Sequence, residues 1–154
     1  CMLKLKVDYP SDEEEMQILK RMGTSNGDIF MKSIVNPKTI LNARAIVNEI
    51  YTDEKIEKYI VDLVLATRSP ERFGLGEISE LISYGASPRA TIYLAQASRA
   101  RAFLQKRGYV IPEDVRYIAE DILRHRLILT YEAEAEEVTT EDLIQRLFDT
   151  IPVP

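Results

Sequence analysis

Residues 84–108 contain the longest helical pattern of the chain, and they read YGASPRATIYLAQASRARAFLQKRG. Ser87 followed by Pro88 is typical of a helix start, because serine can cap the first turn and proline at the first helical position loses no hydrogen bond. Gly108 is typical of a residue that ends a helix. The pattern predicts a helix over residues 88–107, with alanines that let neighbouring helices approach closely. These alanines are Ala90, Ala95, Ala97, Ala100 and Ala102.

Two more helices are predicted downstream of this one. Pro112 opens the first, and its apolar residues recur at helical spacing through Leu123. Thr139 or Thr140 caps the second, which forms the last helix of the chain. The acidic residues 132–137 between them are interpreted as a solvated connection.

Three helices are predicted upstream. The first covers residues 11–22, where Ser11 and Glu14 have the spacing of a capping box. The second runs from Pro37 to about Ile50, after the capping residue Asn36. The third begins at Thr52 or Asp53 and ends near Arg68.

The segments between these helices have no clear helical period. Residues 23–35 are interpreted as a loop, and residues 69–85 as a turn-rich connection with one short helix. Leu3, Leu5 and Val7 alternate with polar residues, which predicts a short strand that stops at Pro10. We therefore expect an all-α bundle of about six to seven helices, with one short N-terminal strand.

The composition is that of an ordinary globular protein, with 154 residues, 45% of them hydrophobic and 29% charged. The net charge of -5 opposes non-specific attraction to nucleic acid or an anionic membrane, so neither is an expected partner. The single cysteine, Cys1, cannot form an internal disulfide, and no apolar run approaches the roughly 20 residues that span a bilayer. We expect a cytoplasmic protein, and its abrupt start indicates a piece of a longer one.

A search for catalytic chemistry finds little in this chain. No glycine precedes a lysine, which excludes the P-loop that cradles nucleotide phosphates. Residues 45–54 superficially resemble a Walker B strand, but Asp53 is better interpreted as a helix cap. One histidine and one cysteine give no metal-ligand cluster. His125, between Arg124 and Arg126, is interpreted as a cation that complements the carbonyls at a helix end.

The segment YGASPRA at residues 84–90 resembles the sensor 2 motif of MoxR-family AAA+ ATPases, and the whole chain is similar to the C-terminal third of that family. One motif of this length would be weak evidence, whereas five segments in the same order are specific. Cys1 departs from the pattern, because the family has Phe there. The other four matching segments are residues 3–10, 109–115, 123–127 (LRHRL) and 151–154.

The resemblance implies that residues 1–10 are the end of the core-domain strand and the hinge, and that residues 11–154 form the helical lid domain. It implies that Arg89 acts on ATP held by a core domain outside this chain. Gly85, Ser87 and Pro88 would set its direction, and Tyr9 and Pro10 would line the adenine pocket. ATP and Mg²⁺ would belong to the parent protein, with no cofactor held by this chain alone.

Physical reasoning supports the same role for Arg89, because free N–H groups and the positive dipole end of a helix favour an anion. The alternative for this residue is a surface arginine paired with a nearby carboxylate. By resemblance, the parent would be a chaperone-like ATPase that remodels proteins. Its partners would be its own core, neighbouring protomers of a ring and von Willebrand factor A-domain proteins. The chain alone is not expected to hydrolyse ATP.

Three other functions remain open from the sequence. A stand-alone helical adaptor would bind another protein through apolar grooves. The lid of a magnesium-chelatase motor is a neighbouring possibility, although the C-terminal segments are more similar to MoxR. Helix-turn-helix binding to DNA is disfavoured by the acidic balance, although arginines on residues 88–107 are compatible with it.

Overall fold

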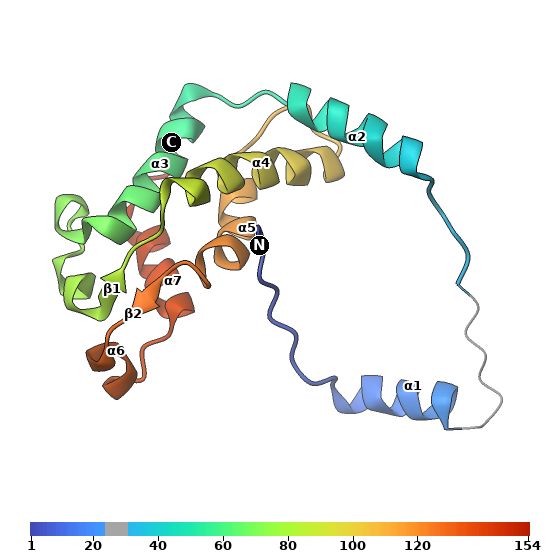
Figure 1. Ribbon diagram of the computed structural model, residues 1–154, viewed down its shortest axis with the longest axis horizontal. Coiled ribbons are helices and arrows are strands. Elements are labelled where there is room, and N and C mark those ends of the chain that lie inside the picture. The colour runs from blue at the N-terminus through green and yellow to red at the C-terminus, as the bar shows by residue number, and fades with distance from the viewer. Residues whose placement is uncertain (24–30) are drawn as a thin grey trace.

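Helix α4 (Pro88–Leu104) lies at the centre of the molecule and contacts three other helices. The computed structural model describes residues 1–23 and 31–154. In Figure 1, α2 lies above the second half of α4, α5 lies below α4, and α3 crosses its beginning. Their bounds are Pro37–Glu49 for α2, Glu54–Arg68 for α3 and Pro112–Leu123 for α5. Helix α7 (Thr140–Thr150) packs on α3 and α5 and completes the bundle.

The core of the bundle is built from the apolar faces of α3, α4, α5 and α7. Helical spacing places these side chains on one face of each helix, and that face packs inward. Small residues on α4 keep it close to its neighbours, since Ala90 and Ala102 are fully buried. The largest fully buried side chains are Ile60, Leu63, Leu75, Ile78, Leu94, Ile122, Leu123, Leu143, Ile144 and Leu147.

Short elements close one end of the bundle. The turn-rich connection forms two 3₁₀ helices, η1 (Pro70–Phe73) and η2 (Gly76–Leu81), where one short helix was predicted. Strand β1 (Ile82–Tyr84) pairs antiparallel with β2 (Ile128–Leu129). This small sheet was not predicted, because two or three residues are too few to show a period.

The interpretation of residues 132–137 as a purely solvated connection was wrong. Helix α6 (Tyr131–Ala135) forms there, and Ala133 is fully buried. The Thr130 hydroxyl accepts a hydrogen bond from the Ala133 N–H at 3.3 Å and caps this helix. The surrounding glutamates face solvent, which conceals the one alanine that packs inward.

Helix α4 ends earlier than predicted, at Leu104, and Gly108 is not its stop. Lys106 adopts a left-handed conformation, with φ of 58°. The Lys106 N–H bonds to the Phe103 carbonyl and the Arg107 N–H to the Ala102 carbonyl, each at 2.9 Å. These two bonds are a Schellman ending, which satisfies two of the last carbonyls of the helix and stops it before the glycine.

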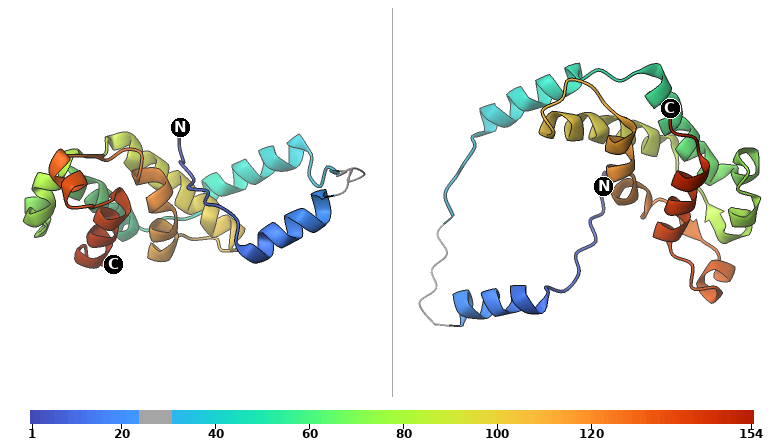
Figure 2. Two further views of the ribbon diagram at one scale, coloured as in Figure 1. Left: turned by 90° about the horizontal axis from the view of Figure 1, so that it is seen from below. Right: turned by 180° about the vertical axis from the view of Figure 1, so that it is seen from behind.

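Residues 1–23 and 31–49 are named the arm. Residues 1–23 extend away from the bundle, and α2 lies against it (Figures 1 and 2). Helix α1 (Asp12–Met22) begins with the predicted capping box of Ser11 and Glu14. The strand predicted at residues 3–7 does not form, because no neighbouring strand supplies a ladder of hydrogen bonds. Of the predicted loop at residues 23–35, residues 24–30 lie outside the described residues, and residues 31–35 contain no helix or strand.

The described residues thus form seven α-helices and one two-stranded sheet, which confirms the all-α bundle predicted from the sequence. None of the described helices has both the length and the apolar content needed to cross a membrane.

Candidate functional site

The first turn of α4 is fixed to the end of α3 by a buried contact. The Ala86 N–H donates to the Thr67 hydroxyl at 2.9 Å, and that hydroxyl donates to the Val64 carbonyl at 2.7 Å. Gly85 passes directly over Thr67, so an added Cβ would lie 2.6 Å from the Thr67 carbonyl carbon. Gly85 therefore lies in close contact with the backbone of α3, which only a residue without a side chain permits.

Ser87 and Pro88 take the positions predicted for them at the helix start, with one difference. Pro88 is in the first turn, and Ser87 has the extended backbone of an N-cap residue. The Ser87 side chain makes no capping hydrogen bond, however, which corrects its predicted role. The Ala90 N–H instead bonds to the Ser87 backbone carbonyl at 2.9 Å, so the hydroxyl is not needed to satisfy it.

Arg89 is exposed on the first turn of α4, immediately after this fixed segment. Six ion pairs join described residues, and Arg89 takes part in none of them. The alternative of a surface arginine paired with a carboxylate therefore has no support from the described part of the chain. A guanidinium with this freedom has five N–H donors for an incoming anion.

Tyr9 and Pro10 are far from the start of α4 in the sequence, and they are also separated from it in space. They belong to the extended segment between the bundle and α1, which Figures 1 and 2 show on the opposite side from the beginning of α4. The Tyr9 side chain is 93% exposed. The structure therefore brings Gly85, Ser87, Pro88 and Arg89 together and leaves Tyr9 and Pro10 apart from them.

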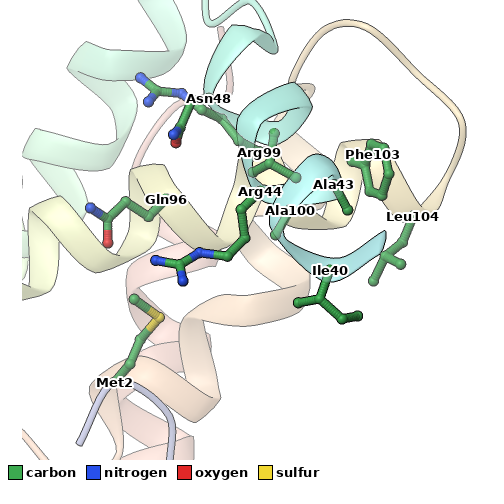
Figure 3. Close-up of a pocket in the computed structure, with 11 residues that line it drawn as sticks. Met2, Ile40, Ala43, Arg44, Asn48, Gln96, Arg99, Ala100, Phe103 and Leu104 are labelled. Atoms are coloured by element: carbon green, nitrogen blue, oxygen red, sulfur yellow. The ribbon is translucent and has the colours of Figure 1, made fainter. Parts of the chain in front are cut away.

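The face of α4 that carries Arg89 continues into two grooves that the sequence reasoning missed. Ile92, Gln96 and Arg99 follow Arg89 at spacings of three, seven and ten residues, which is one helix face. Ile92 and Gln96 line a groove between α3 and α4. A second groove, of about 410 Å³, lies between α2 and α4. Figure 3 shows Arg44 and Arg99 beside apolar side chains there.

His125 does not act as the cation predicted for the end of α5. Burial lowers the pKa of its imidazole, and the positive charges of Arg126 and Lys4 lower it further. Arg126 donates to the Ile122 carbonyl at 2.6 Å and so takes the role expected of His125. Arg126 can only donate, so a neutral imidazole would accept through Nε2 and carry its proton on Nδ1, which has no hydrogen-bond partner among the described residues.

Asp53 caps α3, as the sequence predicted in preference to a Walker B acid. Its carboxylate accepts a hydrogen bond from the Lys55 N–H at 2.9 Å. Across residues 1–23 and 31–154, no group of three or more His, Cys, Asp and Glu side chains could hold a metal ion.

Comparison with known proteins identifies close relatives for nearly the whole chain. The profile of the AAA lid domain matches residues 77–147. Chaperone MoxR1 of Mycobacterium tuberculosis is 38% identical over 153 residues, which are 99% of this chain and 40% of that protein. Protein MoxR of Methylorubrum extorquens is 35% identical over 118 residues, which are 73% of this chain and 34% of that protein.

A solved structure has the same fold. The crystal structure of a Cytophaga hutchinsonii protein, provisionally described as an ATPase, matches with a TM-score of 0.93 and 38% identity. The match covers 99% of this chain and 46% of that one. The chain spans less than half the length of these relatives.

Proposed function

Since this chain belongs to the AAA lid domains of MoxR-family proteins, we propose that Arg89 is its sensor 2 residue and contacts a phosphate of ATP. The observation that carries the proposal is the exposed guanidinium of Arg89 on the fixed first turn of α4, which forms no ion pair with the described residues. The nucleotide would be held by the part of the protein that lies outside this chain. The lid would supply one arginine and a rigid helix to aim it.

The chemistry of this helix start suits a phosphate. The N–H groups of the first turn lack helical partners, and the helix dipole adds a partial positive charge at the same place. The fork of an arginine can donate two parallel hydrogen bonds to phosphate oxygens. Gly85 packs closely on Thr67, and Ala86 donates a hydrogen bond to it. These contacts would hold the helix start in place when the guanidinium binds.

Arg89 would respond to the state of the nucleotide, because its hydrogen bonds require the phosphate to be present. Phosphoryl transfer depends mainly on positioning and on stabilisation of charge, so an added arginine raises the rate by holding the phosphate. Loss of that phosphate after hydrolysis would break the contact and free the lid to move. In this proposal residues 1–10 are the hinge and residues 11–154 the lid, and Gly85, Ser87 and Pro88 orient Arg89.

The wider role follows from the family and remains part of the proposal. The parent protein would be a cytoplasmic, ring-forming ATPase that remodels other proteins, with von Willebrand factor A-domain proteins as partners. The Mg²⁺ that accompanies ATP would be held outside this chain. Tyr9 and Pro10 would line the adenine pocket only if the core domain fills the space between the arm and α4.

The decisive experiment compares Arg89→Ala with the unaltered full-length protein. We expect ATP turnover to fall roughly tenfold or more, because a lost charge-assisted hydrogen bond costs about 1.5–3 kcal/mol and about 1.4 kcal/mol is tenfold in rate. Arg89→Lys should recover part of the loss, since it keeps the charge without the fork.

Arg146→Ala is the matched control, because Arg146 is also an exposed arginine outside the six ion pairs, and it lies on α7. This variant should keep full turnover. Unchanged turnover in Arg89→Ala would contradict the sensor 2 role. ATP hydrolysis by the 154-residue chain alone would contradict the proposal that the nucleotide site lies outside this chain.

The alternative function is a helical adaptor that binds a protein through a groove. The specific observation in its favour is the groove between α2 and α4, which is lined mainly by apolar atoms. This function requires no nucleotide. If the affinity of the full-length protein for its partner changed neither with ATP nor with Arg89→Ala, the adaptor would be favoured over the ATPase lid.

A further inference from the structure

Two arginines of the segment LRHRL fasten the beginning of the arm to the bundle. Arg126 donates from one terminal nitrogen to the Cys1 carbonyl at 2.6 Å and from the other to the Met2 carbonyl at 3.2 Å. Arg124 donates to the Lys4 carbonyl at 2.8 Å. Every acceptor on the arm is a backbone carbonyl, so this attachment fixes the path of the chain whatever side chains the arm carries. Arg124 and Arg126 are named the clasp.

Arg124 is held in place by carboxylates from two helices. Asp121 on α5 accepts from it at 2.7 Å, and Glu141 on α7 accepts at 3.1 Å. The Asp121 backbone carbonyl also accepts from the Lys4 N–H at 2.8 Å, which ties the arm a second time to the same turn of α5. The direction of the Arg124 guanidinium is therefore set before it meets the arm.

Arg126 extends the attachment to α4. Its guanidinium carbon lies 5.1 Å from the centre of the Tyr93 ring, within the range of a cation–π contact. Tyr93 follows Arg89 by four residues on α4, which is about one helical turn. One arginine thus touches both the helix that carries Arg89 and the first two residues of the arm.

We propose that the clasp transmits movement of α4 to the arm, with Arg124 and Arg126 as positioning residues for the nucleotide response. This inference rests on the proposed sensor role of Arg89. A shift of α4 on loss of a phosphate contact would move Tyr93 and, with it, the guanidinium that holds the Cys1 and Met2 carbonyls. Arg124 keeps Lys4 fixed on α5, so the arm turns about that point.

The first test uses hydrogen exchange in the full-length protein without nucleotide. Arg126→Gln should speed the exchange of the Lys4 amide, which bonds to the Asp121 carbonyl, by about tenfold, because residues 1 and 2 beside it lose their bonds to a charged donor. Arg116→Gln is the matched control, since Arg116 lies on α5 over the Phe148 ring at 4.9 Å and holds no arm carbonyl. Unchanged exchange in Arg126→Gln, with α4 and α5 still protected, would overturn the clasp.

The second test separates attachment from transmission. Tyr93→Leu removes the contact with α4 and leaves the arm carbonyls bound, so the arm should stay protected without nucleotide. Addition of a non-hydrolysable ATP analogue should change arm exchange in the unaltered protein, but not in Tyr93→Leu or Arg126→Gln. A response that persists in Tyr93→Leu, or that is absent from the unaltered protein, would overturn transmission through this route.

Kinetics supply a readout that loss of folding would not reproduce. Arg126→Gln and Tyr93→Leu should lower kcat for ATP several-fold while the dissociation constant for ATP stays unchanged, because neither residue touches the nucleotide. A parallel loss of affinity would contradict a positioning role. If Arg89→Ala alone kept full turnover, the sensor proposal would fail, whereas the nucleotide-free exchange test would still decide the clasp.

Discussion

The bundle and the arm use the same kind of amphipathic helix and differ in what covers its apolar face. Among the described residues, every buried apolar side chain lies between Ile50 and Ile151. Helices α1 and α2 have no buried residue, although both begin with the predicted caps. Local sequence therefore determines that a helix forms, whereas burial depends on a partner. The arm exposes Met16, Leu19, Met22, Ile34, Ile40 and Leu41, among other large apolar residues.

The exposed apolar side chains of the arm agree with the greater length of the relatives, which have further chain that could cover them. More than half of the solved Cytophaga hutchinsonii chain lies outside the match, although the arm lies within it. Contiguous exposed apolar side chains are typical of a surface that another part of a protein or a partner covers. We expect the remaining part of the protein to cover the arm, which follows from the proposed lid role.

The largest expected effect concerns the bundle, at Asp114. Its carboxylate is 1% exposed and accepts two hydrogen bonds from Arg107, at 2.6 and 2.8 Å. It also accepts from the Ile111 N–H at 3.0 Å and so joins the end of α4 to the start of α5. Asp114→Ala should lower the free energy of unfolding by about 3–5 kcal/mol, because the Ile111 N–H and the partly buried Arg107 guanidinium lose a buried acceptor for three hydrogen bonds.

Urea denaturation of the chain would measure this loss. Glu136→Ala is the control, since Glu136 is exposed and belongs to none of the ion pairs between described residues. The control should stay within about 0.5 kcal/mol of the unaltered chain. A similar small change in Asp114→Ala would show that the join between α4 and α5 does not stabilise the bundle.

The next effect tests the arm, at Leu19, whose side chain is 64% exposed on α1. Leu19→Lys should change the unfolding free energy of the chain alone by less than about 0.5 kcal/mol. In the full-length protein it should cost about 1.5–3 kcal/mol, the value for burial of a leucine side chain. Gln17→Lys on the same helix should be harmless in both. Equal effects of Leu19→Lys in the two proteins would remove the contrast between arm and bundle.

Whether the sequence predicts a structural feature depends on the sequence separation of the residues that form it. Helix starts were predictable, because Ser11, Asn36 and Asp53 cap their helices through bonds that span two or three residues. The end of α4 was not, since it depends on a left-handed Lys106 that no sequence rule favours. The position of Arg89 followed from Pro88 and from the resemblance to the MoxR family.

Contacts between distant parts of the chain could not be predicted. Arg124 and Lys4 meet across 120 residues, and Thr67 and Ala86 across 19. Residues 123–127 were singled out as a family segment, but one sequence contains no signal that pairs them with residues 1–4. The same reason explains the unpredicted β1–β2 sheet, whose strands are too short to show a pattern.

A smaller effect is expected at Gly85, where the bundle supports the candidate site. Gly85→Ala would press a Cβ on the Thr67 carbonyl, and the backbone must shift to accept it. We expect a loss of about 1–3 kcal/mol in unfolding free energy together with lower ATP turnover in the full-length protein. Gly108→Ala is the control, because no atom lies within 4 Å of its added Cβ. Equal stability of the two variants would exclude a role for this close approach.

The smallest expected effect is the pH dependence of stability that arises from His125, which lies where the arm meets the bundle. Its pKa is lowered in the folded chain, by burial first and then by the charges of Arg126 and Lys4. The unfolded chain therefore binds this proton more readily, so stability is full above the ordinary histidine pKa of about 6.5 and decreases as the pH falls below it.

Because His125 is the only histidine, its contribution can be isolated by substitution. The unaltered chain should lose more unfolding free energy between about pH 7.5 and pH 5.5 than His125→Gln does. The imidazolium formed at low pH would repel Arg126, the arginine that holds the Cys1 and Met2 carbonyls. The Lys4 amide, which bonds to the Asp121 carbonyl, should then exchange faster relative to the bundle at the lower pH. Equal pH dependence in the two chains would show that the neutral His125 does not contribute to this junction.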